Sequence, residues 1–75
     1  MITGAQCRMA RAALKIGVRE LAEMAGVSAM TITRFENGQT GGYADTLDKI
    51  TKALEAAGVQ FIPENGGGAG VRLRK

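Results

Sequence analysis

Apolar residues recur at helical spacing near the start of the chain. Over residues 3–15 they fall at Cys7, Ala10 and Leu14, and basic residues occupy the other side. Steps of three and four positions place side chains on one face of an α-helix. The pattern therefore predicts an amphipathic first helix, which Gly17 is expected to end.

Two shorter helices are predicted next, separated by a tight turn. The first covers residues 18–25, and Gly26 follows at once, where a left-handed conformation costs glycine little. Ser28 is the expected N-cap of the second, which runs to about Asn37. The apolar positions that face the core in this pair are Leu21, Ala22, Ala25, Val27, Ile32 and Phe35.

A fourth helix is expected from about Asp45 to Ala57, with Gly58 after its end. Acidic residues precede basic ones by four positions in Asp45/Lys49 and Asp48/Lys52, an arrangement that stabilises exposed helices. The positions predicted to face the core are Leu47, Ile50, Ala53 or Leu54, and Ala57.

The pattern changes from helical spacing to alternation in the tail, residues 59–75. A short β-branched and aromatic run at 59–62 is followed by a loop rich in glycine and proline, and then by apolar–basic alternation at 71–74. These features predict two short strands. We therefore divide the chain into a helical domain, residues 1–58, and a β-strand tail, residues 59–75.

Residues 17–38, GVRELAEMAGVSAMTITRFENG, carry the most specific motif. Small, apolar, capping and acidic positions coincide at Leu21-Ala22, Gly26-Val27-Ser28, Thr31-Ile32, Glu36 and Gly38. This stretch resembles the helix-turn-helix of Cro and the phage repressors, the XRE family. The resemblance implies a mainly α fold, in which a four-helix lambda-repressor-like DNA-binding domain carries a short C-terminal β-hairpin or pair of strands.

The resemblance also implies which residues contact double-stranded DNA. Residues early in the recognition helix touch base edges in this family; carried over, they are Ala29, Met30, Thr33 and Arg34. The positions expected to contact the DNA backbone are Arg19, Ser28, Thr31, Asn37, Gln39 and Thr40. Val18 and Gly17 depart from the glutamine and serine that family members often have there, so we expect modest base specificity from one subunit.

The amino-acid composition excludes several kinds of functional site. Ten basic residues outnumber seven acidic ones, giving a formal charge of +3 that suits a polyanionic partner. Cys7 is the only cysteine and there is no histidine, which excludes a disulfide framework and a Cys/His zinc site. We expect no enzymatic activity, cofactor or metal, since acid–base and nucleophilic chemistry lack their usual residues.

Cys7 is expected to be a buried apolar group, and Glu36 to pair with Arg11 or Arg8.

The function that these features favour is a bacterial-type transcriptional regulator, a repressor that binds specific DNA as a homodimer. Val59, Phe61, Val71 and Leu73 are the expected dimer interface, because two short strands alone rarely bury such residues. The alternative is an antitoxin-like module whose main partner is another protein. Whether the tail strands pair within or between subunits stays open, as does contact of Arg72, Arg74 and Lys75 with the DNA backbone. No membrane segment or signal peptide is apparent, so we expect a cytoplasmic protein.

Overall fold

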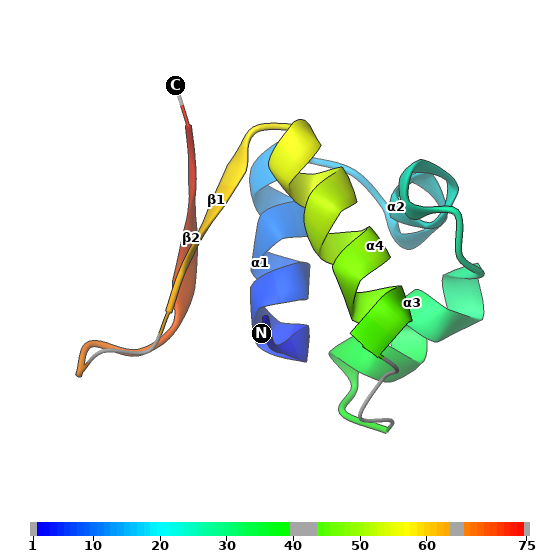
Figure 1. Cartoon of the computed structure of the whole chain (residues 1–75), viewed down its shortest axis with the longest axis horizontal. Helices are drawn as coiled ribbons and strands as arrows, with labels where there is room; N and C mark the ends of the chain where they lie inside the picture. The colour runs from blue at the N-terminus through cyan, green and yellow to red at the C-terminus, as the bar shows by residue number, and fades with distance from the viewer. Residues whose placement is uncertain (1, 40–43, 64–65, 75) are drawn as a thin grey trace.

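The structure is a computed structural model that describes residues 2–39, 44–63 and 66–74. Four helices are followed by a two-stranded antiparallel sheet (Figure 1). The elements are α1 (Gly4–Leu14), α2 (Val18–Ala25), α3 (Ala29–Glu36), α4 (Ala44–Ala56), β1 (Val59–Ile62) and β2 (Gly70–Leu73). The predicted mainly α, lambda-repressor-like fold is confirmed. Among the described helices, none is long and apolar enough to cross a membrane.

Helix α1 lies within its predicted range, residues 3–15. Thr3 is the N-cap, and its hydroxyl accepts a hydrogen bond from the Gln6 N–H while the Gln6 side chain accepts one from the Thr3 N–H. Lys15 is the C-cap, and its φ of 60° is left-handed. The predicted range is confirmed, but the helix is ended by Lys15 and not by Gly17. Ile16, which follows, is half-buried and packs against the core.

The turn between α2 and α3 matches its prediction. Gly26 adopts a φ of 71°, in the region that favours glycine. Ser28 caps α3, because its hydroxyl accepts a hydrogen bond from the Thr31 N–H at 3.1 Å. The glycine turn and the Ser28 cap thus define where α2 ends and α3 begins.

Helix α4 buries Leu47, Ile50 and Leu54. Ala57 lies beyond its end and is exposed, so its predicted place in the core is wrong. Of the two predicted i,i+4 pairs, Asp48 and Lys52 form an ion pair at 3.1 Å, and both side chains are exposed.

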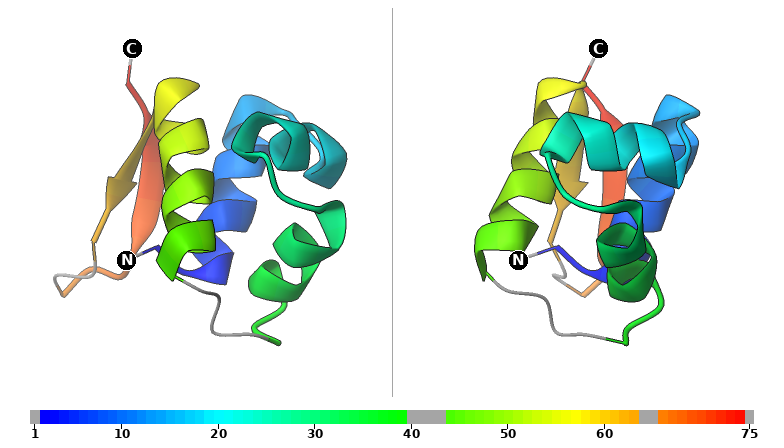
Figure 2. Two further views of the ribbon diagram at one scale, coloured as in Figure 1. Left: turned by 45° about the vertical axis from the view of Figure 1, so that its right-hand side comes forward. Right: turned by 90° about the vertical axis from the view of Figure 1, so that its right-hand side faces the viewer.

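The core lies where the four helices meet the sheet. Helix α2 packs against α3 and α4, while α1 packs against α3 on one side and the sheet on the other. Within the sheet, β1 lies next to α4 and β2 next to α1 (Figure 2). The largest fully buried side chains are Leu21, Ile32, Ile50, Leu54, Val59 and Cys7.

The two tail strands pair within one chain, with Val59 opposite Leu73 and Phe61 opposite Val71. Phe61 and Val71 are half-buried and pack against the helical core. Val59 is completely buried inside its own chain. Its predicted place in a dimer interface is therefore wrong, because its surface is already covered by the helices.

Candidate nucleic-acid interface

The C-terminal end of α3 is held against α1 by a buried ion pair. The Arg11 guanidinium donates two hydrogen bonds to the Glu36 carboxylate, Nε to Oε2 and Nη2 to Oε1, each at 2.7 Å. The Glu36 side chain is 5% exposed and that of Arg11 19%. Such a bidentate contact fixes orientation as well as distance. The predicted pairing of Glu36 with an arginine of the first helix is confirmed.

Two more groups of α1 contact Glu36. Arg8 donates from Nη2 to the Glu36 carbonyl oxygen at 2.9 Å, and the Cys7 thiol donates to Oε2 at 3.3 Å. Burial alone would raise the pKa of Glu36, but the hydrogen bonds from Arg11 and Cys7 and the charges of Arg11 and Arg8 outweigh it and lower that pKa. Glu36 is consequently ionised at neutral pH.

The Cys7 thiol is a neutral donor in this cluster. Burial, followed by its hydrogen bond to Glu36 and the charge of Glu36, raises the pKa of Cys7 to about 12. A thiol is nucleophilic only as its thiolate, so Cys7 is unreactive at neutral pH. Its predicted role as a buried apolar group is confirmed, with the added hydrogen bond.

Gly4 permits the close approach of α1 and α3. A Cβ atom at Gly4 would collide with the Phe35 carbonyl oxygen and would lie 3.0 Å from the Glu36 Cα. Only glycine fits there without moving the backbone of α3.

The outer face of α3 carries three of the four residues predicted to contact bases. Met30 is 61% exposed, and Thr33 and Arg34 are exposed as well. Ala29 is half-buried and packs against the core, so it presents only part of its side chain. The fold therefore brings Met30, Thr33 and Arg34 together on one accessible surface.

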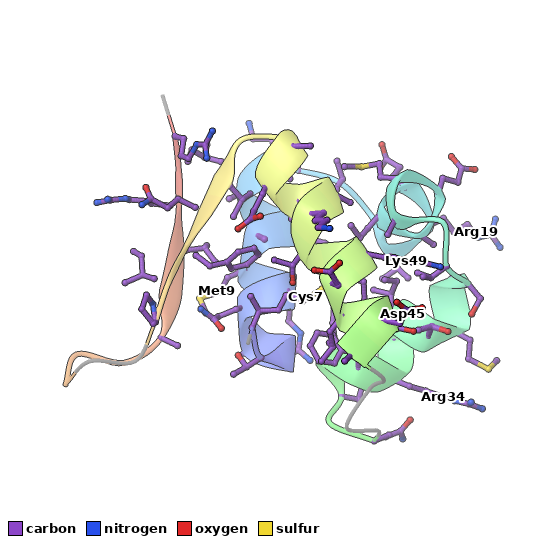
Figure 3. The ribbon with its side chains drawn as sticks, in the orientation of Figure 1. Cys7, Met9, Arg19, Arg34, Asp45 and Lys49 are labelled. Carbon is purple, nitrogen blue, oxygen red and sulfur yellow. The ribbon has the colours of Figure 1, made fainter. Side chains whose placement is uncertain are left out.

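Arg19 of α2 and Arg34 of α3 point away from the body of the molecule on the same side (Figure 3). Among the described residues, neither arginine forms an ion pair. Both cations are thus available to an external anion. This contrasts with Arg8 and Arg11, which are engaged by Glu36.

The other residues predicted to contact the DNA backbone lie around the same surface. The Ser28 and Thr31 hydroxyls bond to each other at 2.8 Å, Asn37 is the C-cap of α3, and Gln39 is exposed. Thr40 lies outside the described residues. Val18, which replaces the family's usual glutamine, is half-buried and packs against the core.

The helix-turn-helix family profile matches residues 8–58, more than half of the 75-residue chain. The chain belongs to this family. It is of the XRE type, a family of DNA-binding transcription regulators, as its motif predicted. A search of curated proteins found no match. The family match covers α2, α3 and α4 completely and α1 from Arg8 onward, and it excludes both strands of the hairpin.

The basic residues of the hairpin do not share the surface of this helix-turn-helix. Figure 1 shows β2, which carries Arg72, at the opposite end of the molecule from α3. Arg72 instead donates from Nε to the Gln60 Oε1 across the sheet at 2.9 Å. Arg72 therefore lies away from the exposed face of α3, and contact of the hairpin's basic residues with the DNA backbone stays a prediction.

The sequence did not indicate one residue that attaches the hairpin to α1. Gln6 is buried, and its Nε2 donates to the Ile62 carbonyl at 3.1 Å and to the Gly70 carbonyl at 3.0 Å. Its spacing from Thr3 is a readable helix-start signal. Nothing in that spacing indicates the second role, because both carbonyls come from the far end of the chain.

Proposed function

We propose that the chain is a repressor that binds specific double-stranded DNA as a homodimer and has no enzymatic activity. The observation that supports this best is Arg34, an exposed guanidinium on the outer face of α3 that forms no ion pair with any residue that the structure describes. A guanidinium matches the O6 and N7 acceptors of guanine in the major groove. The family membership supplies the DNA-binding class, and Arg34 supplies a reader of bases.

The neighbouring side chains suit different parts of the DNA. Met30 has no hydrogen-bonding group and suits the thymine methyl, whereas the Thr33 hydroxyl bonds either donors or acceptors. Arg19 suits phosphate. Thr31, Asn37 and Gln39 are further candidates for backbone contacts. Each contact class makes a different contribution, since phosphate contacts position the protein and base contacts specify the sequence.

Two copies would read two half-sites separated by one helical turn, about 34 Å. Repression requires only that the bound dimer occupy promoter DNA, whereas activation needs a further contact with the transcription machinery. The homodimer also suits a chain of 75 residues, because small domains have marginal cores.

A fluorescence-anisotropy titration tests this proposal. The probes are the DNA upstream of the protein's own gene and a scrambled duplex of equal length, each at 50 and 200 mM salt. We expect tight binding to the upstream DNA, a steep loss of affinity with salt, and weak binding to the scrambled duplex. Equal and weak binding to both duplexes would contradict sequence-specific recognition.

A second candidate function, an antitoxin-like protein-binding module, is favoured by an open groove of about 780 Å³ beneath the hairpin. Its lining includes apolar Ile2, Leu47 and Phe61 and acidic Glu55 and Asp48, of which Asp48 is paired with Lys52. By charge complementarity with Glu55, its occupant would be a partner segment that carries apolar residues and a basic one.

Calorimetric titration with the product of the adjacent gene tests this second candidate. Binding that falls at least about tenfold in Glu55→Lys, and that is unchanged in Glu23→Lys, would support the groove as the site. Glu23 is an exposed acidic residue of α2 and is not part of the groove lining. Absence of binding, or equal binding by both variants, would contradict it.

A further inference from the structure

The outer edge of β2 is open to further strand pairing. The Arg74 N–H donates to the Gly58 carbonyl, so the pairs 58/74, 60/72 and 62/70 face each other across the ladder. By the same alternation, the backbone groups of Val71 and Leu73 point outward. Within the described residues these groups have no hydrogen-bond partner. An unpaired strand edge is a template for pairing with another chain.

An exposed apolar stripe lies on α1 beside this edge. Ala5, Met9 and Ala12 are spaced by four and three residues, which places them on one helix face. All three are exposed, and Met9 is 38% exposed. On one side the stripe is bordered by Gln6 and Ala13, which are buried and half-buried, and on the other by Arg8, whose guanidinium donates to the Glu36 carbonyl. None of the three stripe residues carries a charge.

The middle of the α1 stripe and the middle of β2 lie level with each other along the direction in which both elements run. The bond from Gln6 to Gly70 fixes their relative position, and Figures 1 and 2 show α1 and β2 running in the same direction. A strand rises about 3.3 Å per residue and a helix about 1.5 Å, so the middle of β2 lies level with about Met9. Leu73 then lies near the alanines 12 and 13, which are too short to cover it, and it is 45% exposed.

We infer that a second copy of the chain docks on this surface, which consists of the outer edge of β2, Leu73 and the α1 stripe. The inference rests on the homodimer of the proposed function and names its interface. A two-fold axis at the level of Met9 pairs β2 with its copy in antiparallel orientation and places each stripe against the other. Because the stripe is uncharged, its identical copy meets it without repulsion. The two hairpins become one four-stranded sheet.

This arrangement also suits DNA binding. The sheet lies at one end of the molecule and α2 and α3 at the other, with α1 and α4 between them (Figure 1). A two-fold axis perpendicular to the sheet keeps the helices of both copies on the same side. Both copies of α3 therefore face in one direction, as reading a single duplex requires.

Sedimentation equilibrium without DNA tests the interface. Met9→Glu would bury a charge on the two-fold axis, and we expect the dimer dissociation constant to rise at least about tenfold. Met24→Glu is the matched control, because Met24 is 45% exposed on α2, at the other end of the molecule. Thermal unfolding followed by circular dichroism verifies that both variants are folded.

A cross-link gives a second and independent measurement. Met9→Cys should form an interchain disulfide under mild oxidation, since the two copies of residue 9 lie near the axis, whereas Met24→Cys should not. Cys7 does not interfere, because burial raises its pKa to about 12.

The outcomes separate this interface from the proposed function. A monomeric wild-type chain, a Met9→Glu variant as dimeric as Met24→Glu, or equal cross-linking of both cysteine variants would overturn the interface. If specific binding to the upstream DNA persists in any of these cases, DNA recognition stands. Conversely, a dimer that Met9→Glu disrupts, but that binds all DNA equally, would support the interface and contradict the proposed function.

Discussion

Helix α1 holds its two neighbours by different means. On one side it holds α3 through the Arg11–Glu36 ion pair, with additional bonds from Arg8 and Cys7. On the other side it holds the hairpin through the neutral amide of Gln6 and through half-buried apolar contacts. Helix α1 therefore holds the recognition helix by directional charged bonds, and the hairpin by one neutral amide together with apolar contacts.

This difference separates the element that must be rigid from the element that remains accessible. Base readout requires α3 at a defined angle, and a bidentate pair supplies that geometry. The hairpin needs only to stay in place while its outer edge and Leu73 remain exposed. Breaking each contact in turn measures how differently the two ends are held.

The largest expected effect comes from Arg11→Met. The substitution leaves the buried Glu36 carboxylate without its bidentate partner, and breaking one side of a buried pair costs about 3 kcal/mol of unfolding free energy. Urea unfolding followed by circular dichroism measures it. A loss below about 1 kcal/mol would show that Arg8 and Cys7 suffice to hold Glu36.

A smaller and more local effect is expected from Gln6→Ala. Two carbonyls of the hairpin, at Ile62 and Gly70, lose their donor, at a cost of about 1–3 kcal/mol. Hydrogen exchange should accelerate at hairpin amides much more than at amides of α3. Uniform acceleration over the chain would contradict the separate attachment of the two ends.

Low pH should also weaken the contacts of Glu36 that hold α3 against α1. The pKa of Glu36 is lowered in the folded state, so its contribution to stability is present above the ordinary carboxyl pKa of about 4.5 and is lost as pH falls through the lower folded value. Unfolding free energy should therefore decrease below about pH 4.5, and less steeply in Glu36→Gln. Parallel pH profiles of the wild type and this variant would assign the loss to other carboxyls.

The smallest effect is expected from Asp48→Asn. Asp48 and Lys52 form an i,i+4 pair with both side chains exposed, and such pairs contribute about 0.3–0.5 kcal/mol. The same urea titration applies. If Asp48→Asn lost as much unfolding free energy as Arg11→Met, the contribution of an ion pair would not depend on whether it is buried or exposed.

Local features of this fold were predictable from the sequence. Gly26 and Ser28 define the turn by their own backbone and capping preferences, and Glu36 has a sign that suits an arginine rather than phosphate. The range of α1 was predictable as well, but the left-handed conformation of Lys15 was not, because a lysine has no preference of its own for that region.

Long-range features escaped the sequence for a physical reason. The Gln6 bonds span 56 and 64 residues, and no local pattern encodes such distances. Alternation at residues 71–74 puts Val71 and Leu73 on one face, and strand pairing places Phe61 and Val59 opposite them, but alternation does not say what covers that face. The chain's own helices cover Val59, and Leu73 stays exposed. The expected base contact at Ala29 stays a prediction. Because α3 turns this residue partly inward, only part of its side chain is accessible.

The central claim is that α3 reads bases and that the hairpin does not touch the same DNA. Anisotropy titrations of Arg34→Ala and Arg72→Ala on the upstream and scrambled duplexes test it most directly. We predict that Arg34→Ala loses about tenfold or more in affinity for the upstream DNA and little for the scrambled duplex, because a bidentate guanine contact contributes about 1–3 kcal/mol. Arg72→Ala should leave both affinities unchanged. An equal loss by Arg34→Ala on both duplexes, or a loss by Arg72→Ala as large, would contradict the account.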